Sequence, residues 1–219
     1  MARLTEGISA VFFPPRCVFC KRKLVRGESG ICADCVRELP RRSPEREDRD
    51  GFVSAICAPL EFSGRVREAL HRYKFGGKTA YAGVFGRLVA DCVRENLAGE
   101  YDLVSWVPLS EERMAERGYD QAMLIAMAAA LELDDVAVET LRRTLNTAPQ
   151  SSMRDAASRR GNIAGAYQTV DAELVNGRRV LLIDDIITTG STVSECARTL
   201  LEAGCAGVVC ASVARPAKD

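Results

Sequence analysis

Hydrophobic residues in this chain follow two patterns that alternate along most of its length. Apolar residues three and four positions apart predict amphipathic helices, and short continuous apolar runs predict strands that are buried on both faces. The first pattern predicts helices at residues 64–71, 79–97, 120–133 and 193–203. The second predicts strands at residues 52–62, 103–107, 180–183 and 208–213. Strands that alternate with helices predict an α/β fold, with a parallel sheet covered by helices on both faces.

Charged residues of both signs fill the stretch 41–51, which contains Pro44 and has no apolar period. Such a stretch predicts a solvated linker. It divides the chain into an N-terminal module, residues 1–40, and a body, residues 52–219, whose length suits one domain. The module is too short to be stabilised by burial alone, so we expect it to need a metal or other support.

The overall composition gives little information about the partners of the protein. The 30 basic and 30 acidic residues of the 219 cancel, so no overall field draws the molecule to nucleic acid or an anionic membrane. No stretch approaches the roughly 18 apolar residues of a membrane span, and the run at residues 8–13 lacks a signal-peptide cleavage site. We therefore expect a cytoplasmic protein without membrane insertion.

The nine cysteines fall into two classes. Five stand in apolar segments, where a reduced thiol packs as a small hydrophobic group: Cys57, Cys92, Cys196, Cys205 and Cys210. The other four form the pairs Cys17-x-x-Cys20 and Cys32-x-x-Cys35, separated by eleven residues. Four thiolates favour tetrahedral Zn²⁺, and a closed four-cysteine site indicates structural zinc. Two redox-active pairs, or simply buried thiols, are the alternatives.

Basic residues surround the cysteine pairs. They are Arg16, Lys21, Arg22, Lys23 and Arg26. This charge could meet nucleic acid phosphates, but it would equally well solubilise a small metal-binding module.

A candidate phosphate site follows the strand at residues 180–183. Asp184 and Asp185 come at its end, followed by a loop of hydroxyl and glycine residues that leads into a helix: Thr188, Thr189, Gly190, Ser191 and Thr192. A helix start offers unpaired N–H groups and a partial positive charge to a phosphate, and glycine allows close approach. Carboxylates would repel phosphate, so we expect the two aspartates to accept hydrogen bonds from a cis-diol. The alternative is a buried strand followed by an ordinary N-capping turn.

This segment resembles the phosphoribosyl pyrophosphate (PRPP) signature of type I phosphoribosyltransferases. The resemblance implies that Asp184 and Asp185 hold the ribose hydroxyls and that residues 188–192 surround the 5-phosphate. It also implies the type I phosphoribosyltransferase fold and a Mg²⁺ ion bound with PRPP.

The pyrophosphate of PRPP would then need a second loop at the end of a strand. Candidates follow the strand 103–107, and they are Pro108, Leu109, Ser110, Arg113 and Arg117. The basic loop 142–162 is similar to the flexible loop of glutamine PRPP amidotransferases and suggests a mobile cover. The glutaminase half of those enzymes is lacking here, so their full activity is not expected. Our candidate catalytic residues are Asp184, Asp185, Arg143 and Lys74.

Lys74 lies in a segment that also contains His71, Tyr73 and Phe75. Lys74 could reach a phosphate, and Tyr73 or Phe75 could stack on a base. His71, the only histidine, excludes schemes that need two histidines. It is either a proton carrier or a residue of a helix surface, and we favour the second.

Several short motifs together resemble the ComF family of competence proteins over nearly the whole chain. They are Phe12-Phe-Pro-Pro-Arg-Cys17, His71-Arg-Tyr-Lys74, Val107-Pro-Leu109, Arg117-Gly-Tyr-Asp-Gln-Ala122, Pro149-Gln150, Arg160-Gly-Asn162 and the PRPP loop. The chain has Asp120 where members usually carry Asn, and Val104-Ser-Trp-Val-Pro-Leu109 where they carry Val-Pro-Val-Pro-Leu. The resemblance implies a role in natural transformation, the uptake of DNA.

Three hypotheses stay open. The protein transfers phosphoribosyl from Mg²⁺-bound PRPP to an unknown nucleophile; it is a non-catalytic, PRPP-responsive factor that binds single-stranded DNA and proteins of the uptake machinery; or it salvages nucleobases. No segment that would recognise a base is identifiable from the residues.

Overall fold

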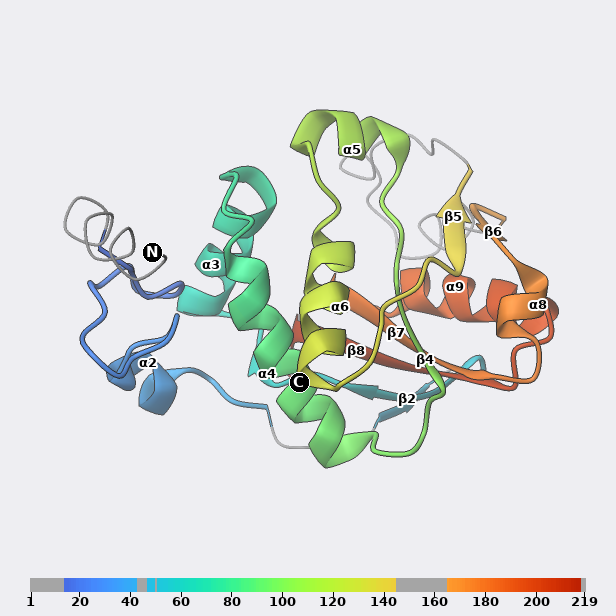
Figure 1. Ribbon diagram of the computed structural model, residues 1–219, viewed down its shortest axis with the longest axis horizontal. Coiled ribbons are helices and arrows are strands. Elements are labelled where there is room, and N and C mark those ends of the chain that lie inside the picture. Colours follow the sequence, from blue (N-terminus) through green and yellow to red (C-terminus); the bar gives the residue numbers. More distant parts are fainter. Residues whose placement is uncertain (1–13, 43–46, 50, 145–164, 218–219) are drawn as a thin grey trace, which may run out of the picture.

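A six-stranded sheet forms the centre of the computed structural model, which describes residues 14–42, 47–49, 51–144 and 165–217 (Figure 1). The strand order is β1-β2-β8-β7-β4, with the short β3 also paired to β8. All pairs are parallel except β1 with β2. The strands are β1 (Glu47–Arg49), β2 (Val53–Cys57), β3 (Leu60–Glu61), β4 (Leu103–Trp106), β7 (Arg179–Ile186) and β8 (Gly207–Arg215).

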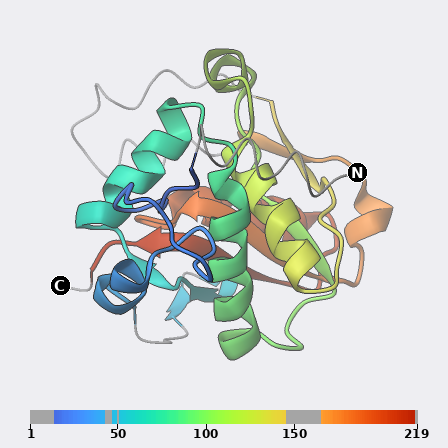
Figure 2. The same cartoon turned by 60° about the vertical axis from the view of Figure 1, so that its left-hand side comes forward.

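Helices cover both faces of this sheet, as the sequence predicts. On one face lie α3 (Gly64–Phe75), α4 (Tyr81–Asn96) and α6 (Gln121–Glu132), which cross in front of the sheet in Figure 2. On the other face lies α9 (Ser191–Glu202). Alternate residues of β7 join the two cores: Leu181 and Ile183 face α4 and α6, and Val180 and Leu182 face α9. Because both faces are buried, the strand reads as a continuous apolar run.

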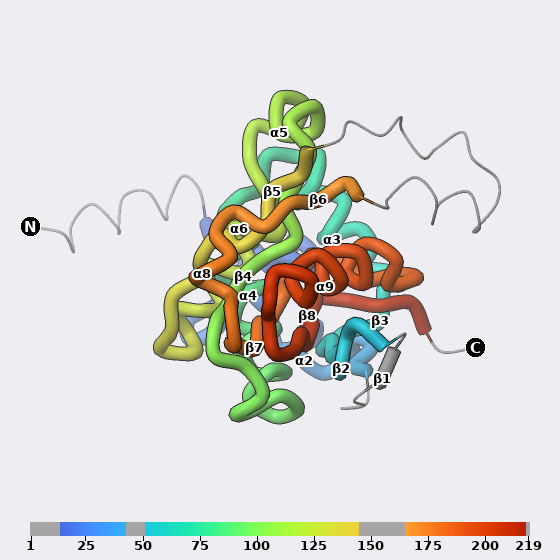
Figure 3. Tube along the Cα trace, turned by 90° about the vertical axis from the view of Figure 1, so that its right-hand side faces the viewer, coloured from blue at the N-terminus to red at the C-terminus, as the bar shows by residue number. Residues whose placement is uncertain are grey.

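Four smaller elements lie outside the six-stranded sheet. They are α5 (Glu111–Arg117), the short α8 (Ala172–Val175), and β5 (Leu141–Arg143) and β6 (Tyr167–Thr169), which pair as a two-stranded antiparallel sheet, the β5–β6 hairpin. Helix α5 and the hairpin are neighbours in both Figure 1 and Figure 3. These elements are too short for hydrophobic periodicity to detect them.

The structure adds detail to three of the predicted segments. The strand predicted at 52–62 is two strands, interrupted at Ala58 and Pro59, because proline cannot donate to the ladder. The linker predicted at 41–51 contains β1, an edge strand that pairs through its backbone and so needs no apolar residues. Arg142 and Arg143 lie on β5 and not in a loop, and residues 145–162 of the predicted loop 142–162 lie outside the described residues.

The N-terminal cysteine segment packs against the body through α3 and α4. Its described residues, which start at 14, include the helix α2 (Ala33–Glu38), and its apolar residues share a core with both body helices. The Phe19 and Phe85 rings lie 6.1 Å apart. The Arg72 guanidinium donates to the carbonyls of Val18 and Phe19, at 2.8 Å each. The division of the chain at residues 40 and 52 stays a prediction.

Burial of the remaining five cysteines, Cys57, Cys92, Cys196, Cys205 and Cys210, agrees with their predicted role as small hydrophobic residues. None of the helices in the described part of the chain has the length and hydropathy needed to cross a membrane.

Candidate functional site

The predicted phosphate loop joins the end of β7 to the start of α9. Gly190 adopts the left-handed conformation (φ 82°) that precedes Ser191, the first residue of α9. A side chain would strain this backbone, so glycine is required here. Residues 188–192 line a small hollow of about 40 Å³, together with Asp184 and three apolar neighbours. The loop and the helix start therefore surround one space, as an N–H cradle for an anion would.

A larger cavity of about 180 Å³ adjoins this hollow and shares Asp184, Ile186 and Thr192 with it. Its walls come from segments far apart in the sequence. They include most of the predicted site residues: Lys74, Pro108, Leu109, Arg113, Arg117, Arg143, Asp184, Asp185 and Thr192. The structure thus brings the acidic pair, three arginines and the phosphate loop to one place.

Lys74 forms an ion pair in this cavity. Its ammonium group lies 2.9 Å from a carboxylate oxygen of Asp185, and both side chains are largely buried. Without a ligand the lysine therefore balances a carboxylate, whereas the sequence suggested contact with a phosphate. Buried charges of this kind are stable only when they are paired.

Asp184 has no such basic partner in direct contact among the described residues. Its carboxylate accepts a hydrogen bond from the Asp185 amide at 2.7 Å. Burial and then the neighbouring charge of Asp185 raise the pKa of Asp184 to about 8, although Lys74 acts in the opposite direction. A ligand that favours the ionised carboxylate, such as a cation or a pair of hydroxyl donors, would relieve this arrangement.

Three guanidinium groups face the same cavity. Burial, followed by the charges of Arg143 and Arg117, lowers the pKa of Arg113. Arg117 donates to the Gln121 side chain at 2.7 Å and lies 5.0 Å from the Phe75 ring centroid. Like charges held this close together in a partly buried site favour the binding of an anion.

Other predicted residues lie elsewhere. Ser110 is buried, and its hydroxyl caps α5 by accepting from the Arg113 amide, so it is not part of the cavity wall. Tyr73 is fully buried and donates to the Gln121 carbonyl, so the idea that it stacks on a base is wrong. His71 is exposed on α3 beside Phe75, as expected of a helix-surface residue. Gln150 and three loop arginines, Arg154, Arg159 and Arg160, lie outside the described residues.

Six residues that line the cavity are not among the predicted site residues, and Tyr167 and Asp120 are two of them. Tyr167 is buried on β6, with the Arg143 guanidinium 5.7 Å from its ring centroid. Asp120 caps α6 by accepting from the Met123 amide, and it also accepts from the Leu109 amide at 2.9 Å. Burial raises its pKa. Asp120 therefore holds the loop at Pro108 and Leu109 in place, and an aspartate directly before a helical pattern was the signal that could have revealed it.

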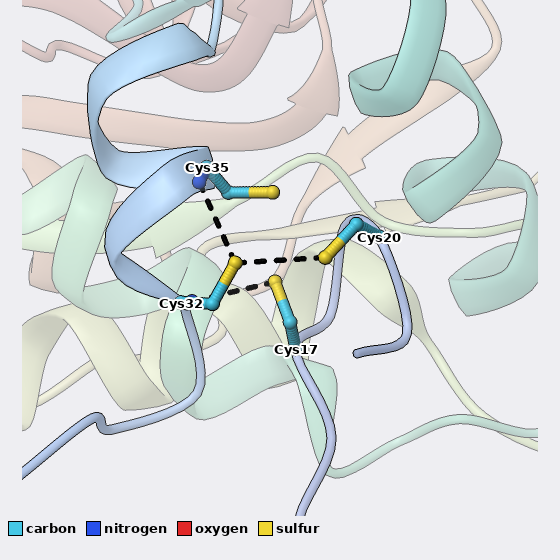
Figure 4. Close-up of side chains that lie close together, drawn as sticks. All are labelled: Cys17, Cys20, Cys32 and Cys35. Atoms are coloured by element: carbon cyan, nitrogen blue, oxygen red, sulfur yellow. Dashed lines mark hydrogen bonds between the residues drawn. The ribbon is translucent and has the colours of Figure 1, made fainter. Parts of the chain in front are cut away.

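The four N-terminal cysteines point toward one another (Figure 4). Their sulfur atoms all lie within 4.8 Å of one another, and those of Cys20 and Cys32 are 3.5 Å apart. Tetrahedral coordination with zinc–sulfur bonds of about 2.3 Å requires sulfur atoms slightly less than about 4 Å apart, close to these separations. Backbone amides donate to the sulfurs of Cys17 and Cys32, which stabilises thiolates. The residues fit a closed, structural zinc site.

One of the basic residues near this cluster, Arg22, already has an acidic partner. Arg22 pairs with Glu28 at 2.5 Å, and Glu28 also accepts from the amides of Val25 and Ala33. Arg22 therefore stabilises the cysteine segment itself. Lys21, Lys23 and Arg26 are exposed, so they are the basic residues available to a partner.

Family models match both parts of the chain. A double zinc ribbon domain matches residues 8–46, and a phosphoribosyl transferase domain matches residues 116–219. These matches agree with the four-cysteine cluster and with the type I phosphoribosyltransferase fold predicted for the body.

Curated relatives match over nearly the full length. The DNA utilization protein YhgH of Escherichia coli O157:H7 is 30% identical, and the match covers 89% of this chain and 94% of that protein. Competence protein F of Haemophilus influenzae is 25% identical, with 88% and 93% covered. Competence protein ComFC of Streptococcus pneumoniae is 26% identical, with 91% and 87% covered.

Among solved structures, a glutamine PRPP amidotransferase from B. subtilis, complexed with ADP and GMP, is similar at a TM-score of 0.43 and 20% identity. The match covers 64% of this chain but only 29% of that one. We draw nothing further from a similarity of this size.

Proposed function

The chain belongs to the ComF family, which includes competence proteins and the DNA utilization protein YhgH, and we propose that it binds Mg²⁺·PRPP. We propose further that this binding has a role in DNA uptake. Relatives named for competence and DNA utilization support the second part of this proposal. The buried, unpaired thiols suit a reducing compartment, so we place the protein in the cytoplasm.

One observation carries the ligand assignment. A single pair of adjoining cavities holds an acidic pair, three arginines and a glycine-containing loop at a helix start. PRPP has matching parts: a ribose diol for Asp184 and Asp185, a 5-phosphate for residues 188–192, and a pyrophosphate for Arg113, Arg117 and Arg143. Charge-assisted hydrogen bonds of this kind are the strong ones.

The same arrangement can support phosphoribosyl transfer. The bond from ribose C1 to the pyrophosphate oxygen breaks, and the electron pair leaves with pyrophosphate, whose charge the three arginines stabilise. A nucleophile then forms the new bond to C1 and releases its proton to solvent. Mg²⁺ bound to PRPP adds charge neutralisation. Positioning and charge stabilisation do most of the work in such a reaction, so no general base is needed near C1.

Calorimetric titration with Mg²⁺·PRPP tests binding. We expect saturable binding that weakens at least about tenfold in Asp184→Asn and in Arg113→Ala, because each variant removes a charged contact. Arg178→Ala is the control, since Arg178 is exposed just before β7, at the end away from the phosphate loop. Binding that is absent, or equal in all variants, would refute the proposal.

Turnover needs a separate experiment. Pyrophosphate release is measured with Mg²⁺·PRPP and a panel of nucleobases and ammonia. Release that is lost in Asp185→Asn identifies a transferase. If PRPP binds and no acceptor yields pyrophosphate, PRPP acts as a signal and not as a substrate.

A second candidate function, binding of single-stranded DNA, is favoured by the exposed Lys21, Lys23 and Arg26 on the cysteine segment. Binding of a fluorescent oligonucleotide should weaken steeply with added salt and in the triple charge reversal to Glu. Arg22 is left unchanged because its pairing with Glu28 is structural. Binding that ignores salt and charge reversal would exclude this function.

A further inference from the structure

Arg117 is the last residue of α5, a short helix whose own packing does not fix the position of the guanidinium group. None of the seven residues of α5 is buried, and Gly118 ends the helix in the left-handed conformation (φ 76°). An arginine side chain on such a helix has many rotamers, and ordering it when a ligand binds costs free energy. Contacts with other elements must therefore hold this guanidinium group.

Two residues outside α5 supply these contacts. The ring centroid of Phe75, the last residue of α3, lies 5.0 Å from the guanidinium carbon, within the range of a cation–π interaction. The side-chain oxygen of Gln121, the first residue of α6, accepts a hydrogen bond from Nη1 of Arg117 at 2.7 Å. The ring and the amide together restrict where the guanidinium group can lie.

Gln121 is itself held in place by several hydrogen bonds. It is 1% exposed, and its side-chain nitrogen donates to the Tyr119 carbonyl at 2.9 Å. Its backbone carbonyl accepts from the buried Tyr73 hydroxyl at 2.9 Å, and the Tyr119 hydroxyl donates to the Tyr73 carbonyl. These bonds join the end of α3 to the start of α6, so the two residues that contact Arg117 belong to one connected structure.

These contacts leave one edge of the Arg117 guanidinium group for a ligand. Gln121 uses Nη1, whereas Nε is buried and has no hydrogen-bond partner within the described part of the chain. Nε and Nη2 form the edge through which an arginine can bind a phosphate group with two parallel hydrogen bonds. Because Arg117 lines the candidate PRPP cavity, a phosphate oxygen in the cavity can accept from the unused donor.

We infer that Phe75 and Gln121 are positioning residues, which hold the Arg117 guanidinium group ready for the pyrophosphate of the ligand. This inference rests on the proposed function for the identity of that ligand. Both residues act through Arg117, and such preorganisation strengthens binding because less side-chain freedom is lost. The Phe75 ring, for which the sequence suggested stacking on a base, thus has an arginine as its partner.

Calorimetric titration of the full chain with Mg²⁺·pyrophosphate and, separately, with ribose 5-phosphate tests this role. Phe75→Leu should weaken Mg²⁺·pyrophosphate binding about threefold, the effect of losing one exposed cation–π contact. Gln121→Met should weaken it about tenfold, because a hydrogen bond to a charged group is lost. The affinity for ribose 5-phosphate should stay unchanged in both variants, whereas a general loosening of the fold would lower both affinities.

Phe75→Tyr keeps an aromatic ring and should retain the wild-type affinity for Mg²⁺·pyrophosphate. Phe52→Leu is the matched control, because Phe52 is also exposed but precedes β2, at the opposite edge of the parallel sheet from the cavity. Phe75 is 56% exposed, so its variants keep the test valid if Gln121→Met is unstable. In an Arg117→Ala background, Phe75→Leu should have no further effect, because the ring acts only through the arginine.

Wild-type affinity for Mg²⁺·pyrophosphate in Phe75→Leu or in Gln121→Met overturns the role of that residue. The inference is also overturned if ribose 5-phosphate binding weakens equally, or if Phe75→Leu has its full effect in the Arg117→Ala background. In each of these cases the proposed function still stands, provided that the wild type binds Mg²⁺·PRPP. If the wild type binds neither Mg²⁺·PRPP nor Mg²⁺·pyrophosphate, the proposed function fails, and the inference fails with it.

Discussion

Asp184 and Asp185 are adjacent at the end of β7, but their carboxylates have different partners. Asp185 is paired with Lys74 at 2.9 Å, so its charge is compensated before any ligand arrives. Within the described part of the chain, the Asp184 carboxylate accepts a hydrogen bond from the neighbouring Asp185 amide at 2.7 Å, and burial raises its pKa to about 8. One carboxylate is therefore ready for a ligand, and the other must lose a proton to become so.

We predict that Mg²⁺·PRPP binding releases a proton from Asp184. Below pH 8 the carboxyl is mostly protonated, and hydroxyl donors or a cation favour its ionised form. Calorimetry at about pH 6.5 in buffers of different ionisation enthalpy should show the release, whereas at about pH 9.5 it should vanish. Asp184→Asn should show no release at either pH. Equal proton release in wild type and variant would contradict the assignment.

The same raised pKa predicts how stability depends on pH. An acid whose pKa is higher in the folded state than in the unfolded state binds more protons when folded, so the free energy of unfolding falls as pH rises. For Asp184 the fall should extend from about pH 4 to about pH 8. Urea unfolding of wild type and Asp184→Asn across this interval measures it. A wild-type curve that rises relative to the variant would exclude this behaviour.

Lys74→Met should affect both aspartates. Removing the ammonium leaves the Asp185 carboxylate buried without a basic partner, and such a loss typically costs about 3–5 kcal/mol. It also removes a charge that lowers the pKa of Asp184, so that pKa should rise further. Carbon NMR titration of the aspartates and chemical denaturation measure the two effects. Lys78→Met, at an exposed position of the following turn, should change neither.

At the scale of elements, the contact between α4 and α6 depends on one glycine. A Cβ at Gly86 would lie 2.5 Å from the Cβ of Ala128 and 2.8 Å from the backbone of α6. No side chain fits there, so the two helices approach more closely than ordinary helices do. This contact places Asp120, the capping residue of α6, next to the cavity.

Gly86→Ala should therefore destabilise the protein by about 1–3 kcal/mol, because overpacking forces the helices apart. Gly83→Ala is the matched control on the same helix, since a Cβ there has nothing within 4 Å. Alanine at that exposed helical position should stabilise by up to about 1 kcal/mol. Thermal unfolding measures both variants, and effects of the same sign would disprove this account of the helix contact.

The longer helices and strands could be predicted from the sequence, because the pattern of their apolar residues matches the faces that they bury. Helix α4 lies within one residue or two of the predicted range, and β7 and β8 are correctly placed as buried strands. Strand β1 and hairpin β5 to β6 could not be predicted. Their positions depend on backbone pairing, of β1 with the next strand β2 and of β5 with the distant β6, and such pairing leaves no pattern in three residues of sequence.

At the scale of the whole molecule, the cysteine segment and the candidate cavity are connected by α3. Arg72 near the end of this helix is held by two carbonyls of the first cysteine pair, and Lys74, two residues later, holds Asp185. Tyr73 between them is buried, and its ring lies edge-on to Phe85 at 5.3 Å. The metal site thus supports the helix that carries Lys74.

Removing zinc should loosen α3 as well as the cysteine segment. In Cys35→Ser, metal affinity falls, the carbonyls that hold Arg72 lose their fixed positions, and hydrogen exchange in α3 should become faster. Cys205→Ser is the control, because a hydroxyl can replace the single S–H of Cys205, which lies near the carbonyls of Arg178 and Gly207, far from the metal site. Exchange in α3 that is unchanged in Cys35→Ser would show that the helix is independent of zinc.

The candidate site was predictable where its residues are contiguous. Asp184 to Thr192 could be placed from one segment, because strand, loop and helix follow one another directly. The partner of Lys74 and the roles of Asp120 and Tyr167 could not, since they depend on how five separate elements meet. The sequence indicates which residues could bind a ligand, but it does not indicate which of them contact one another.

The position of β8 has a consequence for how the chain folds during synthesis. This strand lies between β2 and β7, so Ala55 finds its partner Val209 only after about 150 further residues have been added. Until then the backbone edges of β2 and β7 that face β8 have no hydrogen-bonding partner, and pairing over such distances along the sequence is slow. The growing chain therefore depends on its local helices and metal-binding segment, and the sheet closes in a single late step.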